Sequence, residues 1–163
     1  MKNIISVSLL CVSLATPAFA AERSGSIGAN ISFNGALGVQ AEFALQKPLA
    51  LQLFLKNYSR EYDYGNSFGK YRYSYTAVGA AVVYDFSKEL RLPDKNLHPY
   101  AGLGLHTISA SFYGSGGPID SRVNTGLGLY LTLGAKYDIT SVIDLDASYN
   151  TFGGLTVGAN FRF

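Results

Sequence analysis

The final segment of the chain alternates strictly between two kinds of residue. Its odd-numbered positions from 155 to 163 are all apolar or aromatic, and its even-numbered positions are polar or glycine. A period of two is typical of a β-strand whose two faces meet different surroundings. We therefore expect a two-faced strand that runs to Phe163, with an oily face on one side and a polar face on the other.

The same alternation recurs along the chain, most clearly between Val123 and Ile139. Eight of the nine odd positions there are apolar or aromatic, and glycines and polar residues occupy the even positions. A helix would scatter the leucines around its circumference, and the glycines would weaken it, so a strand is favoured. With this segment, the pattern predicts eight strands, at about 26–33, 37–45, 49–56, 73–86, 100–109, 123–139, 143–150 and 155–163.

The connections between these strands are short or rich in turn residues. Asn34-Gly35 predicts a type I′ hairpin, and loops are expected at 60–71 and 114–121. The charged segment 87–98 is long for a turn and has some helical composition. Small residues occupy both faces of the fourth strand. We expect Asp85 to point inward there, and we expect five residues to point outward: Val78, Ala80, Val82, Tyr84 and Phe86.

The first twenty residues have the features of a secretory signal peptide. Lys2 is followed by an apolar run from Ile4 to Ala15, and Ala18-Phe19-Ala20 offers a small-x-small cleavage site. The run is too short for a transmembrane helix. We therefore expect two parts, a leader at 1–20 and a single domain at 21–163.

Composition excludes several classes of function. Removing Lys2 from the 13 basic residues leaves 12 against 11 acidic residues, which gives no basic patch for nucleic acid. The leader also contains the only Cys, so we expect no disulfide framework and no thiol chemistry in the domain. No cofactor is expected either. No window approaches the 18 consecutive apolar residues of a membrane helix, yet Tyr and Phe are abundant, as they are in membrane barrels.

Eight short-linked strands predict an all-β fold, an eight-stranded antiparallel up-and-down transmembrane β-barrel. Periodicity alone does not distinguish it from a soluble lipocalin-like binding protein, in which the apolar face would point inward. The polar face favours the membrane barrel because its charges are interspersed with glycines, which suits a narrow interior. These charges are Glu42, Lys56, Lys136, Asp144, Asp146 and Arg162.

The chain resembles the small outer-membrane β-barrel superfamily, which includes the transmembrane domain of outer-membrane protein A and outer-membrane protein X. The resemblance rests on the leader, the eight strands, the segment from Leu97 to Leu105 with its Pro-Tyr-x-Gly-x-Gly pattern, and the closing segment from Val157 to Phe163. It implies location in the outer membrane of a Gram-negative bacterium, a monomer, and contact with lipopolysaccharide. It also implies that Phe161 and Phe163 form the signal read by the barrel assembly machinery.

The interior charges have two interpretations. If the turn between the sixth and seventh strands centres near Thr140, Lys136 faces Asp144, and Arg162 can reach Asp144 or Asp146. Glu42 and Lys56 lie on adjacent strands. The preferred interpretation is a structural network that fills the lumen, since eight strands leave room only for side chains. The alternative is a narrow porin-like channel.

Tyrosines flank the second predicted surface loop, at positions 58, 62, 64, 71, 73 and 75. We favour an aromatic girdle at the membrane interface, with basic residues at the level of the lipid headgroups. The alternative is a contact surface for a ligand or for lipopolysaccharide phosphates. Its candidate residues are Arg60, Tyr62, Tyr64, Lys70 and Arg72.

An enzyme that modifies lipids is the rival from another class. His106 and Ser109 fall on opposite faces of their strand, so a base and a nucleophile would point apart. The chain has only two histidines, and its single Cys lies in the leader, so the sequence offers no metal-ligand cluster. We therefore expect no catalytic and no metal site, and a structural or surface-interaction role.

Overall fold

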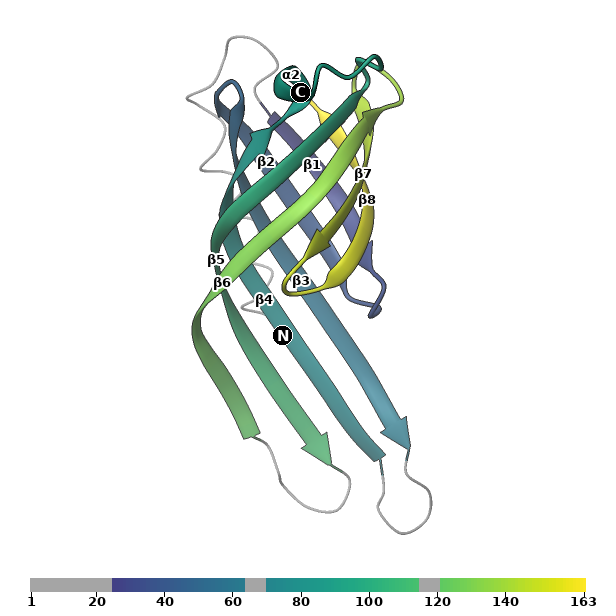
Figure 1. The fold of residues 1–163 in the computed structure, drawn as a ribbon. Coiled ribbons are helices and arrows are strands. Elements are labelled where there is room, and N and C mark those ends of the chain that lie inside the picture. The colour runs from purple at the N-terminus through teal and green to yellow at the C-terminus, as the bar shows by residue number, and fades with distance from the viewer. Residues whose placement is uncertain (1–24, 64–69, 115–120) are drawn as a thin grey trace.

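The alternating segments form eight antiparallel strands in the computed structural model, and each strand pairs with the next until β8 pairs with β1 (Figure 1). The predicted up-and-down barrel is therefore confirmed. The strands are β1 (Gly25–Ser32), β2 (Leu37–Gln46), β3 (Leu49–Asp63), β4 (Lys70–Asp85), β5 (Leu97–Gly114), β6 (Ser121–Asp138), β7 (Ile143–Asn150) and β8 (Gly154–Arg162). Closure matters because an open strand edge in lipid would leave backbone groups without hydrogen-bond partners.

The structure describes residues 25–63, 70–114 and 121–163, and their side chains except in 62–71 and 113–125. The predicted leader and the side chains of Tyr62, Tyr64 and Lys70 lie outside this part of the chain. Within it, no helix is long and apolar enough to cross a membrane. The one helical turn that is described, α2 (Ser87–Leu90), lies in the segment where the composition indicated some helix.

The burial pattern is the reverse of that of a soluble protein. Along β7 the polar side chains at Asp144, Asp146, Ser148 and Asn150 are buried, and the alternate apolar ones are exposed. The ambiguous β4 follows the expected assignment: Ala77 and Ala81 are buried, whereas Val78 and Val82 are almost half exposed. An apolar outer face and a polar interior suit a bilayer and exclude the lipocalin-like alternative.

The hairpin at Asn34 differs from the predicted type. Ser32 and Ala36 still pair, so the loop has three residues, and only Gly35 has a positive φ, 88°. A type I′ turn needs a positive φ at both central residues, whereas a three-residue loop needs it only at the last. The Asn34 side chain instead accepts a hydrogen bond from the backbone N–H of Ala36.

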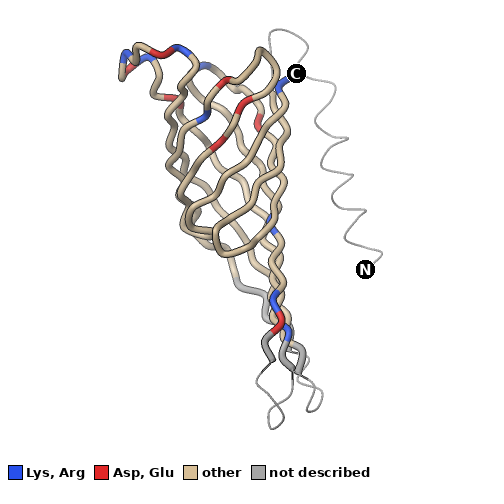
Figure 2. The backbone as a smooth tube through the Cα atoms, turned by 90° about the vertical axis from the view of Figure 1, so that its right-hand side faces the viewer, with Lys and Arg blue, Asp and Glu red and all other residues tan. Residues whose placement is uncertain are grey.

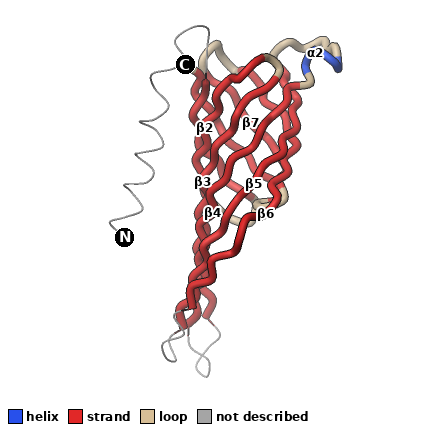
Figure 3. The backbone as a smooth tube through the Cα atoms, turned by 90° about the vertical axis from the view of Figure 1, so that its left-hand side faces the viewer, coloured by secondary structure: helices blue, strands red, loops and turns tan. Residues whose placement is uncertain are grey.

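The strands differ in length in a way that the sequence only partly predicted. β1, β2, β7 and β8 have 8 to 10 residues, whereas β3 to β6 have 15 to 18. Residues 60–63 and 70–71, which were expected in a loop, continue β3 and β4, and β5 is longer than the predicted 100–109. Figures 1 and 3 show these four strands projecting well beyond the closed part of the barrel.

We call this projecting sheet the extension; it comprises residues 58–63, 70–75, 108–114 and 121–125. β2 pairs with β3 only as far as Asn57, and β7 pairs with β6 only from Thr132, so the outer strands of the extension have lost those neighbours. The opposite end of the barrel carries α2 and Phe163, and it is called the α2 end (Figures 1 and 3).

Candidate functional site

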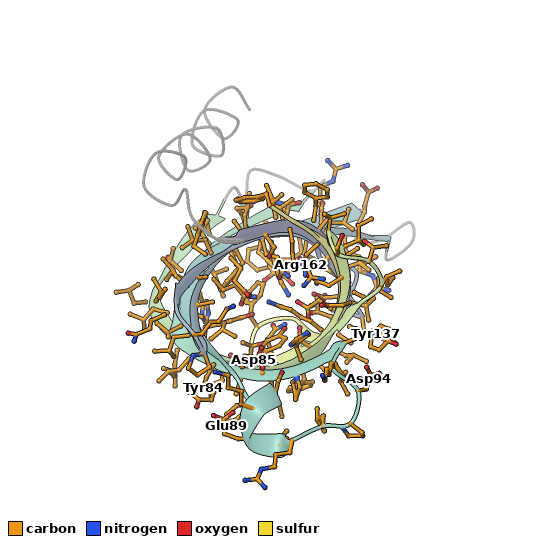
Figure 4. All side chains as sticks on the ribbon, turned by 90° about the horizontal axis from the view of Figure 1, so that it is seen from above. Tyr84, Asp85, Glu89, Asp94, Tyr137 and Arg162 are labelled. Atoms are coloured by element: carbon orange, nitrogen blue, oxygen red, sulfur yellow. The ribbon has the colours of Figure 1, made fainter. Side chains whose placement is uncertain are left out.

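Charged side chains gather inside the α2 end of the barrel, where Figure 2 shows acidic and basic positions close together. Lys136 Nζ on β6 lies 2.5 Å from Glu42 Oε2 on β2, a strand that does not neighbour β6. Arg162 points from β8 into the lumen (Figure 4) and binds Asp138 at 2.8 Å, with its Nε 3.5 Å from Asp144. These ion pairs tie together walls that are far apart in the sequence.

His98 on β5 lies between two carboxylates at the same end. Its Nδ1 is 3.3 Å from Asp85 Oδ2, and its Nε2 is 3.4 Å from Asp138 Oδ2. Ser87 Oγ is 3.1 Å from His98 Nδ1, but its hydroxyl donates to Asp85. In a serine triad the imidazole accepts the proton of the hydroxyl, whereas Ser87 donates to a carboxylate, so the arrangement differs from that triad.

These groups line a cavity of about 210 Å³ that opens at the α2 end. Its charged walls come from six strands and include most of the sequence-predicted charges. The lining residues with charged or titratable side chains are Glu42, Asp85, His98, Lys136, Asp138, Asp144 and Arg162.

Hydrogen bonds fill the middle of the lumen. Buried Asp146 accepts from the hydroxyl of Tyr100 at 2.8 Å and from Gln40 Nε2 at 2.9 Å. Gln40 Nε2 also lies 2.9 Å from Asn160 Oδ1, and Asn160 donates to Asp144. Each carboxylate here is satisfied by neutral donors or by Arg162, as buried polar groups require.

Lys56 is buried nearer the extension and is held by hydroxyl groups. Its side chain is only 2% exposed, and Nζ donates to Ser32 Oγ at 3.2 Å and to Thr156 Oγ1 at 3.1 Å. Asn150 donates to the same Thr156 oxygen and accepts from the backbone of Gly153. Lys56 therefore ties β3 to β1 and β8, and Asn150 links the same Thr156 hydroxyl to the turn between β7 and β8.

An aromatic layer crosses the lumen near Lys56. The rings of Phe54 and Tyr130 lie 4.3 Å apart between centroids, and both side chains are buried with Ala81. Phe152, from the turn between β7 and β8, packs against this cluster and contacts the rings of His106 and Tyr75. This layer lies between the cavity at the α2 end and the extension.

The predicted ion pairs are partly wrong. Lys136 lies opposite Asp146 rather than Asp144, because the turn centres on Ser141, one residue later than expected. Lys136 nevertheless pairs with Glu42, since Asp146 is already occupied. The prediction that Arg162 reaches Asp144 is confirmed.

Glu42 and Lys56 do not meet, although they lie on adjacent strands. Glu42 is opposite Gln52, and Lys56 is opposite Gly38. The offset of four residues separates their levels by about 13 Å along the strand. Adjacency of strands is therefore not enough to pair two charges.

The three tyrosines of the extension whose side chains are described, Tyr58, Tyr73 and Tyr75, do not form the predicted girdle. Tyr58 pairs with Tyr75, and Tyr73 pairs with Phe112, on the face that continues the lumen wall. The opposite face carries Ser59, Ser74 and Ser111 in one row. A girdle would face lipid, whereas these rings contact each other and Phe152.

Two of the predicted surface-contact residues have described side chains. Arg72 is exposed on the outward face and pairs with Glu61 at 2.9 Å. Arg60 is exposed and lies on the inward face, opposite Tyr73. The five predicted residues therefore do not form one patch in the part of the chain where side chains are described.

Phe161 and Phe163 are both about half exposed on the outer face of the closing strand. The backbone of Phe163 exchanges hydrogen bonds with Gly25, so pairing of the last strand with β1 continues to the final residue. This placement is compatible with a role in assembly, which stays a prediction.

Several important residues were missing from the predicted site. His98, Asp138, Tyr100 and Gln40 join the lumen network, and Phe54, Tyr130 and Phe152 form the aromatic layer. Asp138 could have been found because it falls on the polar face of its strand. Phe152 lies in a turn, where the alternation gives no signal.

The rival catalytic pair does not assemble. His106 faces the lumen beside Tyr130 and Phe152, whereas Ser109 is exposed on the other face of β5. Among the residues that the structure describes, no group of His, Cys, Asp and Glu is arranged to hold a metal ion.

A closed eight-stranded barrel with an apolar exterior and a polar, filled interior defines an integral outer-membrane β-barrel protein. The chain belongs to the outer membrane protein β-barrel domain family, whose model matches residues 6–163. The protein is therefore located in the outer membrane.

Solved structures share this fold at low sequence identity. The N-terminal β-barrel domain of OprF from Pseudomonas aeruginosa aligns with a TM-score of 0.64 and 19% identity, covering 86% of this chain and 98% of that one. Neisserial surface protein A aligns with a TM-score of 0.59 and 23% identity, covering 86% and 94%. The attachment invasion locus protein Ail of Yersinia pestis, solved with a heparin analogue, aligns at 0.51 and 15%, covering 86% and 97%. No curated protein sequence matches the chain.

Proposed function

We propose that this protein is a monomeric surface-interaction barrel with a closed lumen, which anchors the extension at the outside of the outer membrane. The aromatic layer formed by Phe54, Tyr130 and Phe152 carries the proposal. An eight-stranded interior is just wide enough for side chains to fill, and the layer joins the middle of the lumen to the floor of the extension. A barrel with a filled lumen holds an exposed sheet in place and does not let solutes pass.

The asymmetry of the strands supports the same role. Four strands continue past the level at which the others turn, and they do so as a regular paired sheet rather than as a loop. Each residue that is ordered in this sheet loses about 1–2 kcal/mol of backbone entropy. Because the sheet is ordered in spite of this cost, we infer that it has a function. Display of a rigid surface is a use that fits its position.

We further propose that the protein has no catalytic chemistry of its own. The separation of His106 from Ser109 and the carboxylate-bound hydroxyl of Ser87 support this view. Lipopolysaccharide and the bilayer are its proposed surroundings, and the barrel assembly machinery is its proposed partner during insertion, through Phe161 and Phe163.

Single-channel recording in planar bilayers tests the closed lumen. The wild-type protein should show no stable conductance steps, whereas Phe54→Ala combined with Phe152→Ala should conduct, because both changes remove rings from the same layer. Phe112→Ala, which removes a ring from the extension, is the matched control and should stay closed. Steady conductance by the wild-type protein would show that the narrow-channel alternative is correct.

A further inference from the structure

Both ring nitrogens of His98 face hydrogen-bond acceptors. Nδ1 lies 3.3 Å from Asp85 Oδ2 and 3.1 Å from Ser87 Oγ, and Nε2 lies 3.4 Å from Asp138 Oδ2. The Ser87 hydroxyl donates its proton to the other carboxylate oxygen of Asp85, so lone pairs face the ring on both sides. A neutral imidazole has one donor and one acceptor nitrogen, whereas a protonated imidazole has two donors. The surroundings of both nitrogens therefore match the charged ring.

The charges on the cavity wall favour the same protonation state. The charged side chains that line the cavity with His98 come from β2, β4, β6, β7 and β8, and they are Glu42, Asp85, Asp138, Asp144, Lys136 and Arg162. Lys136 lies opposite His98 on the neighbouring strand, but it pairs with Glu42 across the lumen. Arg162 pairs with Asp138. Four carboxylates and two cations leave a net charge of −2 on this wall, which a proton on His98 reduces.

Asp85 connects this histidine to α2. It is the last residue of β4, and its Oδ1 also accepts a hydrogen bond of 2.7 Å from the backbone N–H of Ser87, the first residue of α2. One carboxylate thus holds Ser87 through two hydrogen bonds. None of the four residues of α2 is buried, so packing contributes little to its position. The start of α2 is therefore held mainly by polar contacts with Asp85.

Loss of the proton from Nδ1 to water would change the partners of Asp85. The carboxylate beside Nε2 cannot donate to a bare ring nitrogen, but the hydroxyl of Ser87 beside Nδ1 can. The neutral ring is best satisfied with its remaining proton on Nε2, toward Asp138, and with the Ser87 hydroxyl turned to donate to Nδ1. Asp85 then loses its contact with the ring and its hydrogen bond from the Ser87 hydroxyl in the same step.

We propose that His98 is a proton-operated latch at the α2 end of the barrel. The protonated ring bridges Asp85 and Asp138 and, through Asp85, holds the start of α2 beside the opening of the lumen (Figure 4). With the neutral ring, the Ser87 hydroxyl turns from Asp85 to His98, and the segment 86–96 moves more freely. Imidazole ordinarily changes charge at about pH 6.5, so the latch responds to the pH of the compartment that the α2 end faces. This inference does not depend on the proposed role of the extension.

Nuclear magnetic resonance of the refolded full chain in detergent tests the latch. The pH is varied from about 5 to about 8, a range that spans the ordinary titration of imidazole. The chain has two histidines, so the ring signals of His98 are assigned with His106→Gln. Both ring nitrogens of His98 should carry protons at the lowest pH, and only Nε2 at the highest. The backbone N–H signal of Ser87 should shift with the same midpoint as the ring, because both groups report the change of partners at Asp85.

A nitroxide label on α2 measures whether the segment is released. Lys88→Cys combined with Cys11→Ser gives a single labelling site, in α2. The rotational correlation time of the label, measured by electron paramagnetic resonance, should become roughly twofold shorter between the lowest and the highest pH. His98→Arg keeps a positive charge throughout and should keep the label slow at both ends of the range. His98→Gln has no titrating ring and should give the same mobility at both.

His106→Gln is the matched control, because His106 lies on the same strand but beside the aromatic layer. It should retain the pH dependence of the wild-type protein, and heat-modifiable gel migration checks that each variant folds. A Ser87 signal that does not move with the His98 ring would overturn the proposal. So would a label whose mobility is independent of pH in the wild-type protein, or dependent on pH in His98→Gln. Conductance tests the closed lumen separately, so either proposal can fail without the other.

Discussion

Lys136 reaches across the lumen to Glu42, with Nζ and Oε2 2.5 Å apart, although the residue beside it on the next strand is Asp146. The ammonium group also lies 5.2 Å from the centre of the Tyr100 ring. Because Tyr100 and Gln40 already satisfy Asp146, the lysine finds its carboxylate on the opposite wall. The ion pair thus acts as a strut between β2 and β6.

Removing the acidic half of this strut should destabilise the barrel. Glu42→Gln leaves Lys136, whose side chain is 14% exposed, without its carboxylate. The expected loss in the free energy of unfolding is about 1–3 kcal/mol, measured by denaturant titration of protein refolded into lipid vesicles. Adding Lys136→Met to Glu42→Gln removes the orphaned charge and should recover part of the loss. A single variant as stable as the wild type would show that the strut contributes nothing.

The boundary between apolar and polar outward residues on β3 should be visible in the cost of a charge. Leu53→Arg places a charge in the apolar band and should destabilise the barrel by about 2–4 kcal/mol. Ser59→Arg is on the same face of the same strand, but in the extension, and should change stability by less than about 0.5 kcal/mol. The same vesicle titration compares them, and similar costs at the two positions would place the extension inside the membrane.

Gly79 provides space for the aromatic layer. A Cβ there would lie 2.3 Å from Phe54 Cζ and 2.7 Å from the carbonyl oxygen of Leu105, and the latter is backbone that cannot easily shift. Gly79→Ala should therefore cost about 1–3 kcal/mol through overpacking. Gly126 has no atom within 4 Å of the equivalent position, so Gly126→Ala is the matched control and should be neutral. Equal thermal stability of the two variants would contradict the packing described here.

The faces of the strands were predictable because the side-chain period of a strand is two and each face meets one environment throughout the barrel. Val78 and Asp85 were assigned correctly even on the ambiguous β4. The pairing of Lys136 was not predictable, since a turn centred one residue later moves its partner by two positions. Its contact with Glu42 depends on the barrel diameter, which the pattern of one strand does not contain.

The tyrosines show a different limit of sequence reasoning. Tyr58, Tyr73 and Tyr75 were assigned to a girdle because aromatic residues near a surface loop usually belong to one. Their phase argued otherwise: Asn57, Ser59 and Ser74 occupy the outward positions, so the polar and apolar faces exchange roles there. The exchange of polar and apolar faces is present in the sequence. Interpreting it requires knowing that β3 to β6 continue beyond the closed part of the barrel, and the alternation alone did not predict that extra length.

Labelling of single cysteines in intact cells tests the account most directly. The only Cys of the chain, Cys11, lies in the predicted leader, so the wild-type protein should not react with a membrane-impermeant maleimide. Ser59→Cys, in the extension, should be labelled on intact cells, whereas Lys95→Cys, in the connection at the α2 end, should be labelled only after the outer membrane is permeabilised. Labelling of Lys95→Cys on intact cells, with protection of Ser59→Cys, would contradict a barrel that presents its extension at the cell surface.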